Sequence, residues 1–272
     1  MNNLTDITYL KSFLKQSGLK PRHYLGQNFL VDQDVLNRII EAADLKKSDT
    51  VLEVGPGIGT LTSELIKRAG KVIAVEKDES MARIFEKEYG IWIQIPNSKF
   101  QLVNQDILRF HLDRHIQGPY KVVANIPYYL TSVLFQYFLG QENKPELLVL
   151  MVQKEVAERV VASPGELSVL GISVQFYADP EIVGIVNKES FWPQPKVDSA
   201  ILKITPVNKF PEVEDEKLFF RIVKSAFAGK RKQLKNTIRD VEALRRAGVE
   251  PTARPQDLQI EDWVRLYKIM KR

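Results

Sequence analysis

Residues 50–59 read Thr50-Val51-Leu52-Glu53-Val54-Gly55-Pro56-Gly57-Ile58-Gly59, and this stretch decides the fold of the 272-residue chain. Its first five residues have the composition of a buried strand, and a helical pattern follows from 60 to 69. Glycines between a strand and a helix let the backbone approach a ligand, and the helix N-terminus offers it free N–H groups. The stretch therefore predicts an α/β domain that holds a cofactor at this turn.

The spacing of these glycines favours one kind of cofactor. It is G-x-G-x-G, whereas dinucleotide-binding enzymes carry G-x-G-x-x-G. Pro56 also lacks the N–H group that a pyrophosphate would need. A zwitterionic cofactor without phosphate therefore fits better than NAD, and a dehydrogenase is disfavoured.

Polar residues follow several of the predicted strands, and ligands of open α/β sheets bind beyond the carboxyl ends of the strands. Glu76 lies 21 residues after Gly55, where an acidic residue takes ribose hydroxyl groups in such units. Asp106 can accept a hydrogen bond from an adenine amino group, and Ile107 can pack on the ring. Together with residues 50–54, the predicted strands are 71–75, 100–103, 120–124, 146–152, 181–186 and 197–204.

The strand at 120–124 runs into Asn125-Ile126-Pro127-Tyr128. The Asn125 side-chain oxygen and the carbonyl of Ile126 or Pro127 can each accept a hydrogen bond. Tyr128 offers a flat face on which a base can stack. Two acceptors and an aromatic face suit the exocyclic amine of a nucleobase. An ordinary strand-to-turn transition is the alternative, which the motifs upstream make less attractive.

The N-terminal residues predict a helix within 1–20 and then a segment that covers the cofactor. Residues 21–30 change from basic to polar to apolar, with Gly26 as a hinge, so they can lie over a pocket as a lid. A further helix is predicted from 32 to 45. Residues 90–98 are apolar, and we predict a loop there without assigning it a role.

The bulk composition excludes several classes of protein. Cysteine is absent, so there is neither a disulfide framework nor a thiolate metal site. His111 and His115 are four residues apart, but their polar context favours no metal. No apolar stretch approaches the roughly 20 residues of a membrane span, and the N-terminus lacks the features of a signal peptide. We expect a cytoplasmic monomer that does not bind membranes.

The positive charge lies at the C-terminal end. The whole chain carries +5, whereas residues 209–272 contain 16 Lys and Arg against 10 Asp and Glu, a net of +6. Residues 206–216 have the composition of a linker, and helical patterns follow. We predict a domain from 1 to 207, including the leading helix and lid in 1–31, and a helical RNA-binding domain from 208 to 272. A basic helix from 229 to 236 would contact phosphates through Lys230, Arg231, Lys232 and Lys235.

In combination, these motifs resemble the KsgA (RsmA) family of ribosomal RNA adenine dimethyltransferases. The resemblance covers the chain from about residue 20 to the last helix. It rests on 27–30, 53–59, Glu76, Asp106 and 125–128, with support from 191–200 and 229–232.

The resemblance implies a Rossmann-like, class I methyltransferase domain with a seven-stranded sheet, a small helical C-terminal domain and S-adenosylmethionine as methyl donor. The target base would lie against Tyr128, with Phe191 a candidate for its opposite face. Asn125, Pro127 and Tyr128 would be catalytic. The cofactor-binding residues are expected to be Asn28, Leu30, Gly55, Gly57, Glu76, Asp106, Ile107 and Asn125.

The implied reaction is N6,N6-dimethylation of two adjacent adenosines in the 3′-terminal hairpin loop of 16S rRNA, with a role in small-subunit biogenesis. Two alternatives remain. A large-subunit (23S) rRNA adenine N6-methyltransferase of the macrolide-resistance type shares every motif and differs in its target RNA. A ribosome-assembly factor on a methyltransferase scaffold is less favoured, because the glycine loop and residues 125–128 are intact.

Overall fold

A computed structural model describes residues 4–22, 26–93, 99–229 and 231–271. Lys230 lies outside them, and so do residues 94–98 of the loop predicted at 90–98. Residues 90–93 are helical, so the predicted loop is wrong there. The chain packs as two units, Met1–Lys154 with Glu181–Thr205, and Glu155–Pro180 with Pro206–Arg272. The sequence predicted a boundary at 207/208. In the structure the chain passes from the first unit to the second between residues 205 and 206, and residues 155–180 also belong to the second unit.

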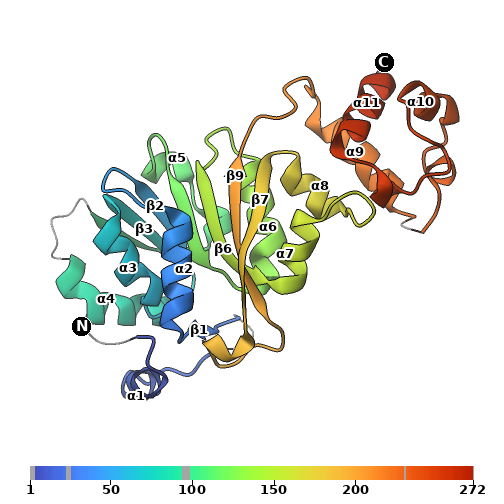
Figure 1. Ribbon diagram of the computed structural model, residues 1–272. Coiled ribbons are helices and arrows are strands. Elements are labelled where there is room, and N and C mark those ends of the chain that lie inside the picture. The colour runs from blue at the N-terminus through green and yellow to red at the C-terminus, as the bar shows by residue number, and fades with distance from the viewer. Residues whose placement is uncertain (1–3, 23–25, 94–98, 230, 272) are drawn as a thin grey trace. The chain divides into compact units, whose positions relative to one another are not determined.

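The first unit is built on a seven-stranded sheet, the number of strands that the resemblance implied, and the strand order is β4-β3-β2-β5-β6-β9-β7 (Figure 1). Strands β4, β3, β2, β5 and β6 pair in parallel, and β9 is antiparallel to β6. The order reverses between β2 and β5. The bounds are β2 (Thr50–Val54), β3 (Lys71–Glu76), β4 (Phe100–Asn104), β5 (Lys121–Asn125), β6 (Leu147–Gln153), β7 (Ala178–Val186) and β9 (Ser199–Pro206).

Two helices, α1 (Ile7–Gln16) and α2 (Gln33–Ala43), precede the first strand of this sheet. Helices connect the strands that follow, as parallel pairing requires. They are α3 (Thr60–Arg68), α4 (Glu79–Ile93), α5 (Leu112–His115), α6 (Thr131–Leu139), α7 (Lys154–Val161) and α8 (Val169–Gln175). Two single 3-10 turns follow these strands. η2 (Ile107–Arg109) begins directly after Asp106, and η3 (Tyr128–Leu130) begins directly after Pro127.

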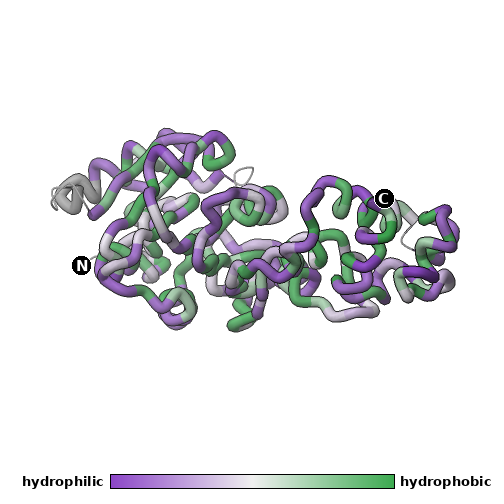
Figure 2. The backbone as a smooth tube through the Cα atoms, turned by 90° about the horizontal axis from the view of Figure 1, so that it is seen from above, coloured by the Kyte–Doolittle hydropathy of each residue, from purple (hydrophilic) through white to green (hydrophobic). Residues whose placement is uncertain are grey.

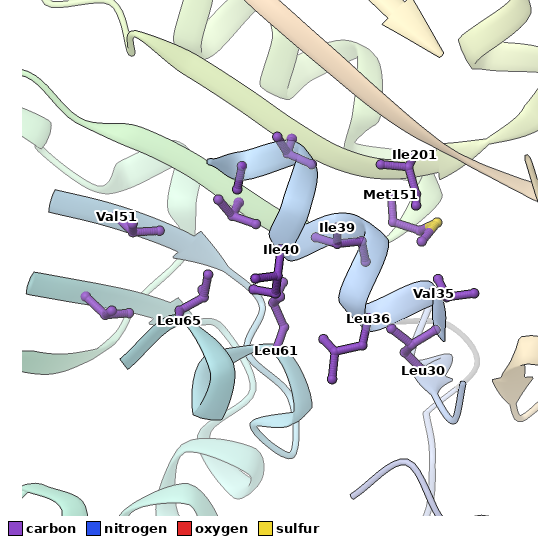
Figure 3. Close-up of a cluster of buried hydrophobic side chains, with 14 of the residues drawn as sticks. Leu30, Val35, Leu36, Ile39, Ile40, Val51, Leu61, Leu65, Met151 and Ile201 are labelled. Carbon is purple, nitrogen blue, oxygen red and sulfur yellow. The ribbon is translucent and has the colours of Figure 1, made fainter. Parts of the chain in front are cut away.

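Helices α2 and α3 lie side by side on one face of the sheet (Figure 1). Their apolar residues recur at helical spacing, and the strands present every second residue to that face, so the two patterns meet in one buried cluster. Figure 3 shows the part of this core that contains Leu36, Ile39, Ile40, Leu61 and Leu65 from the helices, with Val51, Met151 and Ile201 from the strands. This packing fixes the start of α3 against the end of β2.

The second unit is helical. It contains α9 (Glu216–Phe227), α10 (Val241–Arg246) and α11 (Ile260–Met270), together with α8 and most of α7. Apolar and polar residues alternate along these helices (Figure 2), because each helix buries one face. Trp263, Phe219 and Leu244 are fully buried in its core, and Leu167 and Phe176 from the earlier segment join them.

The predicted basic helix from 229 to 236 is wrong. The chain there forms a turn and one 3-10 turn, η5 (Leu234–Asn236). The N–H groups of Leu234 and Lys235 donate to the carbonyls of Ala253 and Pro251 at 2.8 and 3.0 Å. In a helix these two N–H groups would instead donate to carbonyls four residues earlier. The tertiary hydrogen bonds therefore outweigh the helix propensity of the local sequence.

A lysine from strand β5 holds the end of helix α2. Lys121 Nζ donates to the carbonyls of Ala43 and Asp44 at 3.1 and 2.6 Å, and pairs with the Asp49 carboxylate at 2.8 Å. A cation is favourable there because the last carbonyls of a helix carry partial negative charge. Burial would raise the pKa of Asp49, but its hydrogen bonds, foremost that from Lys121, hold it below its usual value.

We therefore expect Lys121→Met to lower the free energy of unfolding by about 1–3 kcal/mol, because it leaves the partly buried Asp49 carboxylate without its charged partner. Urea titration measures this change. Lys67→Met is the matched control, since it removes a helix-surface pair with Glu64 and should cost less than about 1 kcal/mol. Equal losses in the two variants would contradict the stabilising role of Lys121.

Candidate functional site

A cavity opens beyond the carboxyl ends of β2, β3, β4 and β5, where the strand order reverses. It holds about 1000 Å³ of empty space, counting the part open to solvent. This is the position at which open α/β sheets bind ligands. The structure brings together around it all eight of the residues predicted to bind cofactor: Asn28, Leu30, Gly55, Gly57, Glu76, Asp106, Ile107 and Asn125.

The loop after β2 has a backbone that only glycine adopts readily. Gly55, Gly57 and Gly59 have φ angles of +69°, +56° and +88°, in the left-handed region that side chains disfavour. A Cβ at Gly57 would also lie 3.4 Å from the ring of Phe29. The loop therefore needs its glycines both for its shape and for close approach to the lid.

Glu76, the last residue of β3, is 8% exposed and faces the glycine loop. Its carboxylate accepts the N–H of Asp78 at 2.7 Å and the N–H of Gly57 at 3.3 Å. Burial raises the pKa of Glu76, against the lowering by these two hydrogen bonds. The carboxylate is thus held in one orientation at the cavity wall, as a residue that receives ribose hydroxyl groups must be.

Asp78 joins the lid to this carboxylate. Its side chain is 4% exposed and accepts hydrogen bonds from the Arg22 guanidinium at 3.1 Å and the Gln27 amide at 3.0 Å. Gln27 in turn accepts the N–H of Arg22 at 2.8 Å. Because the N–H of Asp78 donates to Glu76, the lid and the predicted ribose site share one network. The sequence analysis missed Asp78, although an acidic residue two positions after Glu76 was a signal.

Asp106 lines the cavity beyond the end of β4, the strand that pairs with β3. Its Oδ1 caps the η2 turn by accepting the N–H of Leu108 at 3.0 Å, and its Oδ2 pairs with Lys77 at 2.8 Å. The Lys77 ammonium lowers the pKa of Asp106, so the carboxyl stays ionised near neutral pH. Lys77 is 58% exposed, and exposed pairs contribute little, so a ligand can replace this contact. Ile107 beside it is buried.

Asn125 connects the end of β5 to the lid. Its Nδ2 donates to the carbonyl of Asn28 at 3.2 Å, so the bond leaves the acceptor oxygen of the amide unused. Pro127 also lines the cavity. A Cβ at Gly26 would lie 3.0 Å from the Cβ of Pro127, which shows how closely the lid backbone approaches this turn.

Two neighbouring tyrosines occupy different positions. Tyr129 lines the cavity and is 54% exposed, whereas Tyr128 is half-buried and does not line it. The Tyr128 hydroxyl is hydrogen-bonded to Ser199 Oγ at 2.6 Å. Sequence reasoning singled out Tyr128 and missed Tyr129 as a wall of the cavity.

Phe191 is placed differently from the prediction. It is 3% exposed and belongs to the core that also holds Leu30. The two residues pair between β1 (Phe29–Leu30) and β8 (Phe191–Trp192), a two-stranded sheet that the sequence analysis missed. Since its ring is packed against the core, Phe191 offers no free face to a base, and that prediction is corrected.

The predicted phosphate contacts that the structure describes are Arg231, Lys232 and Lys235, all exposed in the second unit. Lys230 lies outside the described residues. Within the described part of the chain, no three His, Asp or Glu side chains are grouped to hold a metal ion. No described helix has the length and apolar composition needed to cross a membrane.

Glu53 is a third candidate residue whose role was not predicted from the sequence, although a carboxylate inside an apolar strand was a clear signal. It is 1% exposed, lines the cavity, and its Oε2 has no hydrogen-bond partner among the described residues. The same holds for the buried Thr60 Oγ1. Burial raises the pKa of Glu53 to about 8, and the nearby Glu76 carboxylate adds to the shift. An unsatisfied buried acceptor at a cavity wall calls for a bound group or water.

A mainly parallel sheet with an antiparallel β9, and a cavity of glycines and carboxylates at its carboxyl edge, define the class of protein as a Rossmann-like methyltransferase. Solved structures support this class. A dimethyladenosine transferase from Plasmodium falciparum matches with a TM-score of 0.76 at 27% identity, over 87% of this chain and 95% of that one. The 23S rRNA methyltransferase ErmE matches with a TM-score of 0.71 at 30% identity, over 90% and 100%.

The chain belongs to the ribosomal RNA adenine dimethylase family, whose model matches residues 18–272. A ribosomal RNA small subunit methyltransferase A from Dehalococcoides mccartyi is 43% identical over 267 residues, which cover 93% of this chain and 89% of the relative. A protein of the same name from Lactobacillus acidophilus is 39% identical, with 94% and 93% coverage. The predicted family and enzyme class are thereby confirmed.

Glu53 gives a prediction about pH. Its folded pKa of about 8 exceeds the unfolded value of roughly 4.3, so the folded state holds a proton that the unfolded state releases between these values. The resulting stability is complete below the unfolded pKa and is lost as the pH rises through 8. Glu53→Gln should remove this dependence. Chemical denaturation at pH 5.5, 7.0 and 8.5 should show wild type losing stability relative to Glu53→Gln, whereas parallel profiles would contradict the buried, protonated carboxyl.

Proposed function

We propose that this enzyme transfers methyl groups from S-adenosylmethionine to N6 of two adjacent adenosines in the 3′-terminal hairpin loop of 16S rRNA. The observation that carries the proposal is the place of Asn125, at the end of β5 and on the cavity wall. The small-subunit names of the relatives support the choice of RNA. They favour this substrate over 23S rRNA, whose methyltransferase ErmE shares the fold.

The residues around the cavity fit S-adenosylmethionine. Glu76 would receive the ribose hydroxyl groups, and Asp106 would accept from the adenine amine with Ile107 against the ring. The Oε2 of Glu53, which has no partner among the described residues, would accept from the positively charged amino-acid end once that cation lowers the pKa of Glu53 and the carboxyl ionises. The glycine loop lets the backbone approach the cofactor closely, and this cofactor carries no phosphate whose charge the loop would have to neutralise. When bound, this cofactor supplies an electrophilic methyl group.

Asn125 and one backbone carbonyl would hold the target amine. The carbonyl of Pro127 already accepts the N–H of Leu130 at 3.0 Å, so the carbonyl of Ile126 is the better second acceptor. Two acceptors fix the N6 amine and increase electron density on its nitrogen, which lowers the barrier by orientation and electrostatics. No strong base is needed, because the methylated nitrogen is cationic and loses its proton readily.

The RNA-binding part of the proposal rests on two features. A base that reacts at N6 must leave its stack, which is least costly for a loop nucleotide, and Tyr128 would stack on it. Arg231, Lys232 and Lys235 would contact phosphates, so binding should weaken as salt rises. Methylation of this kind is compatible with a role in small-subunit biogenesis.

Asn125→Ala should bind S-adenosylmethionine within a few-fold of wild type and lose turnover by orders of magnitude, because it removes an acceptor that acts on the amine. Calorimetry measures cofactor binding, and transfer of labelled methyl groups measures turnover. Asn37→Ala, at an exposed position of α2, is the matched control and should behave as wild type. Unchanged turnover in Asn125→Ala would exclude the assigned role.

The substrate is tested with labelled S-adenosylmethionine and small ribosomal subunits from cells that lack the modification. Digestion to nucleosides should yield labelled N6,N6-dimethyladenosine. Label that enters only large-subunit RNA would instead identify a 23S rRNA enzyme. Subunit binding without any label would favour an assembly factor.

A further inference from the structure

Ser199 stands at the start of β9, at the same edge of the sheet as the candidate site. Because β9 is antiparallel to β6, its first residue pairs with Gln153, the last residue of β6. Ser199 is therefore brought to the carboxyl edge at which Asn125 ends β5. Its side chain is fully buried, and its Oγ lies 2.6 Å from the Tyr128 hydroxyl. The two residues are 71 positions apart in the sequence.

The backbone of Tyr128 is fixed independently. The carbonyl of Pro127 accepts the N–H of Leu130 at 3.0 Å, and the carbonyl of Tyr128 accepts the Thr131 hydroxyl at 3.0 Å. A tyrosine side chain has only two torsions between its backbone and its ring. With the backbone held by the turn and the hydroxyl held by Ser199, the direction of the ring axis is fixed. The ring can still turn about that axis, but a phenolic O–H prefers the plane of its ring, so a bond to Ser199 also favours one ring plane.

We propose that Ser199 is a positioning residue that sets the orientation of the Tyr128 ring against the target base. This inference rests on the proposed function, in which Tyr128 stacks on the adenosine. A stacking surface acts on the reaction only if its plane is correct, since the amine must lie in line with the methyl group. The buried hydroxyl pair supplies that constraint without touching the substrate.

A merely structural role for Ser199 is the alternative, and the chain contains a matched control. Ser190, in the segment that leads to β9, is also buried at 9% exposure, and its Oγ donates to Asp32 Oδ2 at 2.7 Å. Ser190→Ala therefore removes a buried serine hydrogen bond of nearly the same length that does not involve Tyr128.

The test compares Ser199→Ala, Tyr128→Phe, the double variant and Ser190→Ala with wild type. Turnover and KM are measured on small-subunit RNA, cofactor affinity by calorimetry and stability by thermal unfolding. Ser199→Ala and Tyr128→Phe should each lower kcat about tenfold, with cofactor affinity within twofold of wild type. The double variant should have the same kcat as either single variant, because all three lose the same hydrogen bond. Ser190→Ala should keep kcat within twofold of wild type.

Three results would overturn the positioning role: wild-type kcat in Ser199→Ala, an equal loss in Ser190→Ala, or losses that multiply in the double variant. Tyr128→Phe keeps the serine and so carries the test if Ser199→Ala does not fold, with wild-type kcat again overturning the role. Absence of turnover by the wild-type enzyme would overturn the proposed function and this role with it. Normal wild-type turnover with an unaffected Ser199→Ala overturns the positioning role alone.

Discussion

The site depends on the parallel pairing of β4, β3, β2, β5 and β6. Parallel register brings the carboxyl ends of these strands to one edge, so residues far apart in sequence arrive together without a dedicated contact. Glu76 and Asn125 end two of these strands and Asp106 closely follows a third, and for this reason all three line one cavity. The apolar packing of α2 and α3 on the sheet keeps that edge rigid, which allows short polar loops to carry the chemistry.

The lid is joined to this edge at several points rather than at one hinge. Asp78 binds Arg22 and Gln27, Asn125 binds the carbonyl of Asn28, and β1 pairs with β8. The contacts of Asn125, Asn28 and Leu30 use residues assigned to the ligand, and Asp78 lies two residues after Glu76, which is also assigned to it. Closure of the lid and arrangement of the cavity are therefore parts of the same hydrogen-bond network.

Much of this arrangement could be predicted from sequence, because it follows from local patterns. The seven strands are short apolar runs with distinct ends. The spacing of the glycines directly predicts a loop whose backbone adopts conformations that only glycine favours. The misses have tertiary causes. Residues 229–236 contain no helix-breaking residue apart from Gly229, whereas in the structure the N–H groups of Leu234 and Lys235 donate to the carbonyls of Ala253 and Pro251. From sequence alone, Phe191 could be an exposed aromatic residue on which a base stacks. Its pairing with Leu30, which the sequence does not reveal, places it in the core instead.

The second unit is built from two separate stretches of the chain, which affects how it folds during synthesis and whether it can be exchanged between enzymes. The second unit draws on two separate stretches, and Leu167, Ile172 and Phe176 of the earlier one share a core with Phe219 and Trp263 of the later one. During synthesis the earlier stretch leaves the ribosome long before its partners exist. The C-terminal stretch is thus not a detachable module: to graft it onto another enzyme, both stretches would have to be exchanged together.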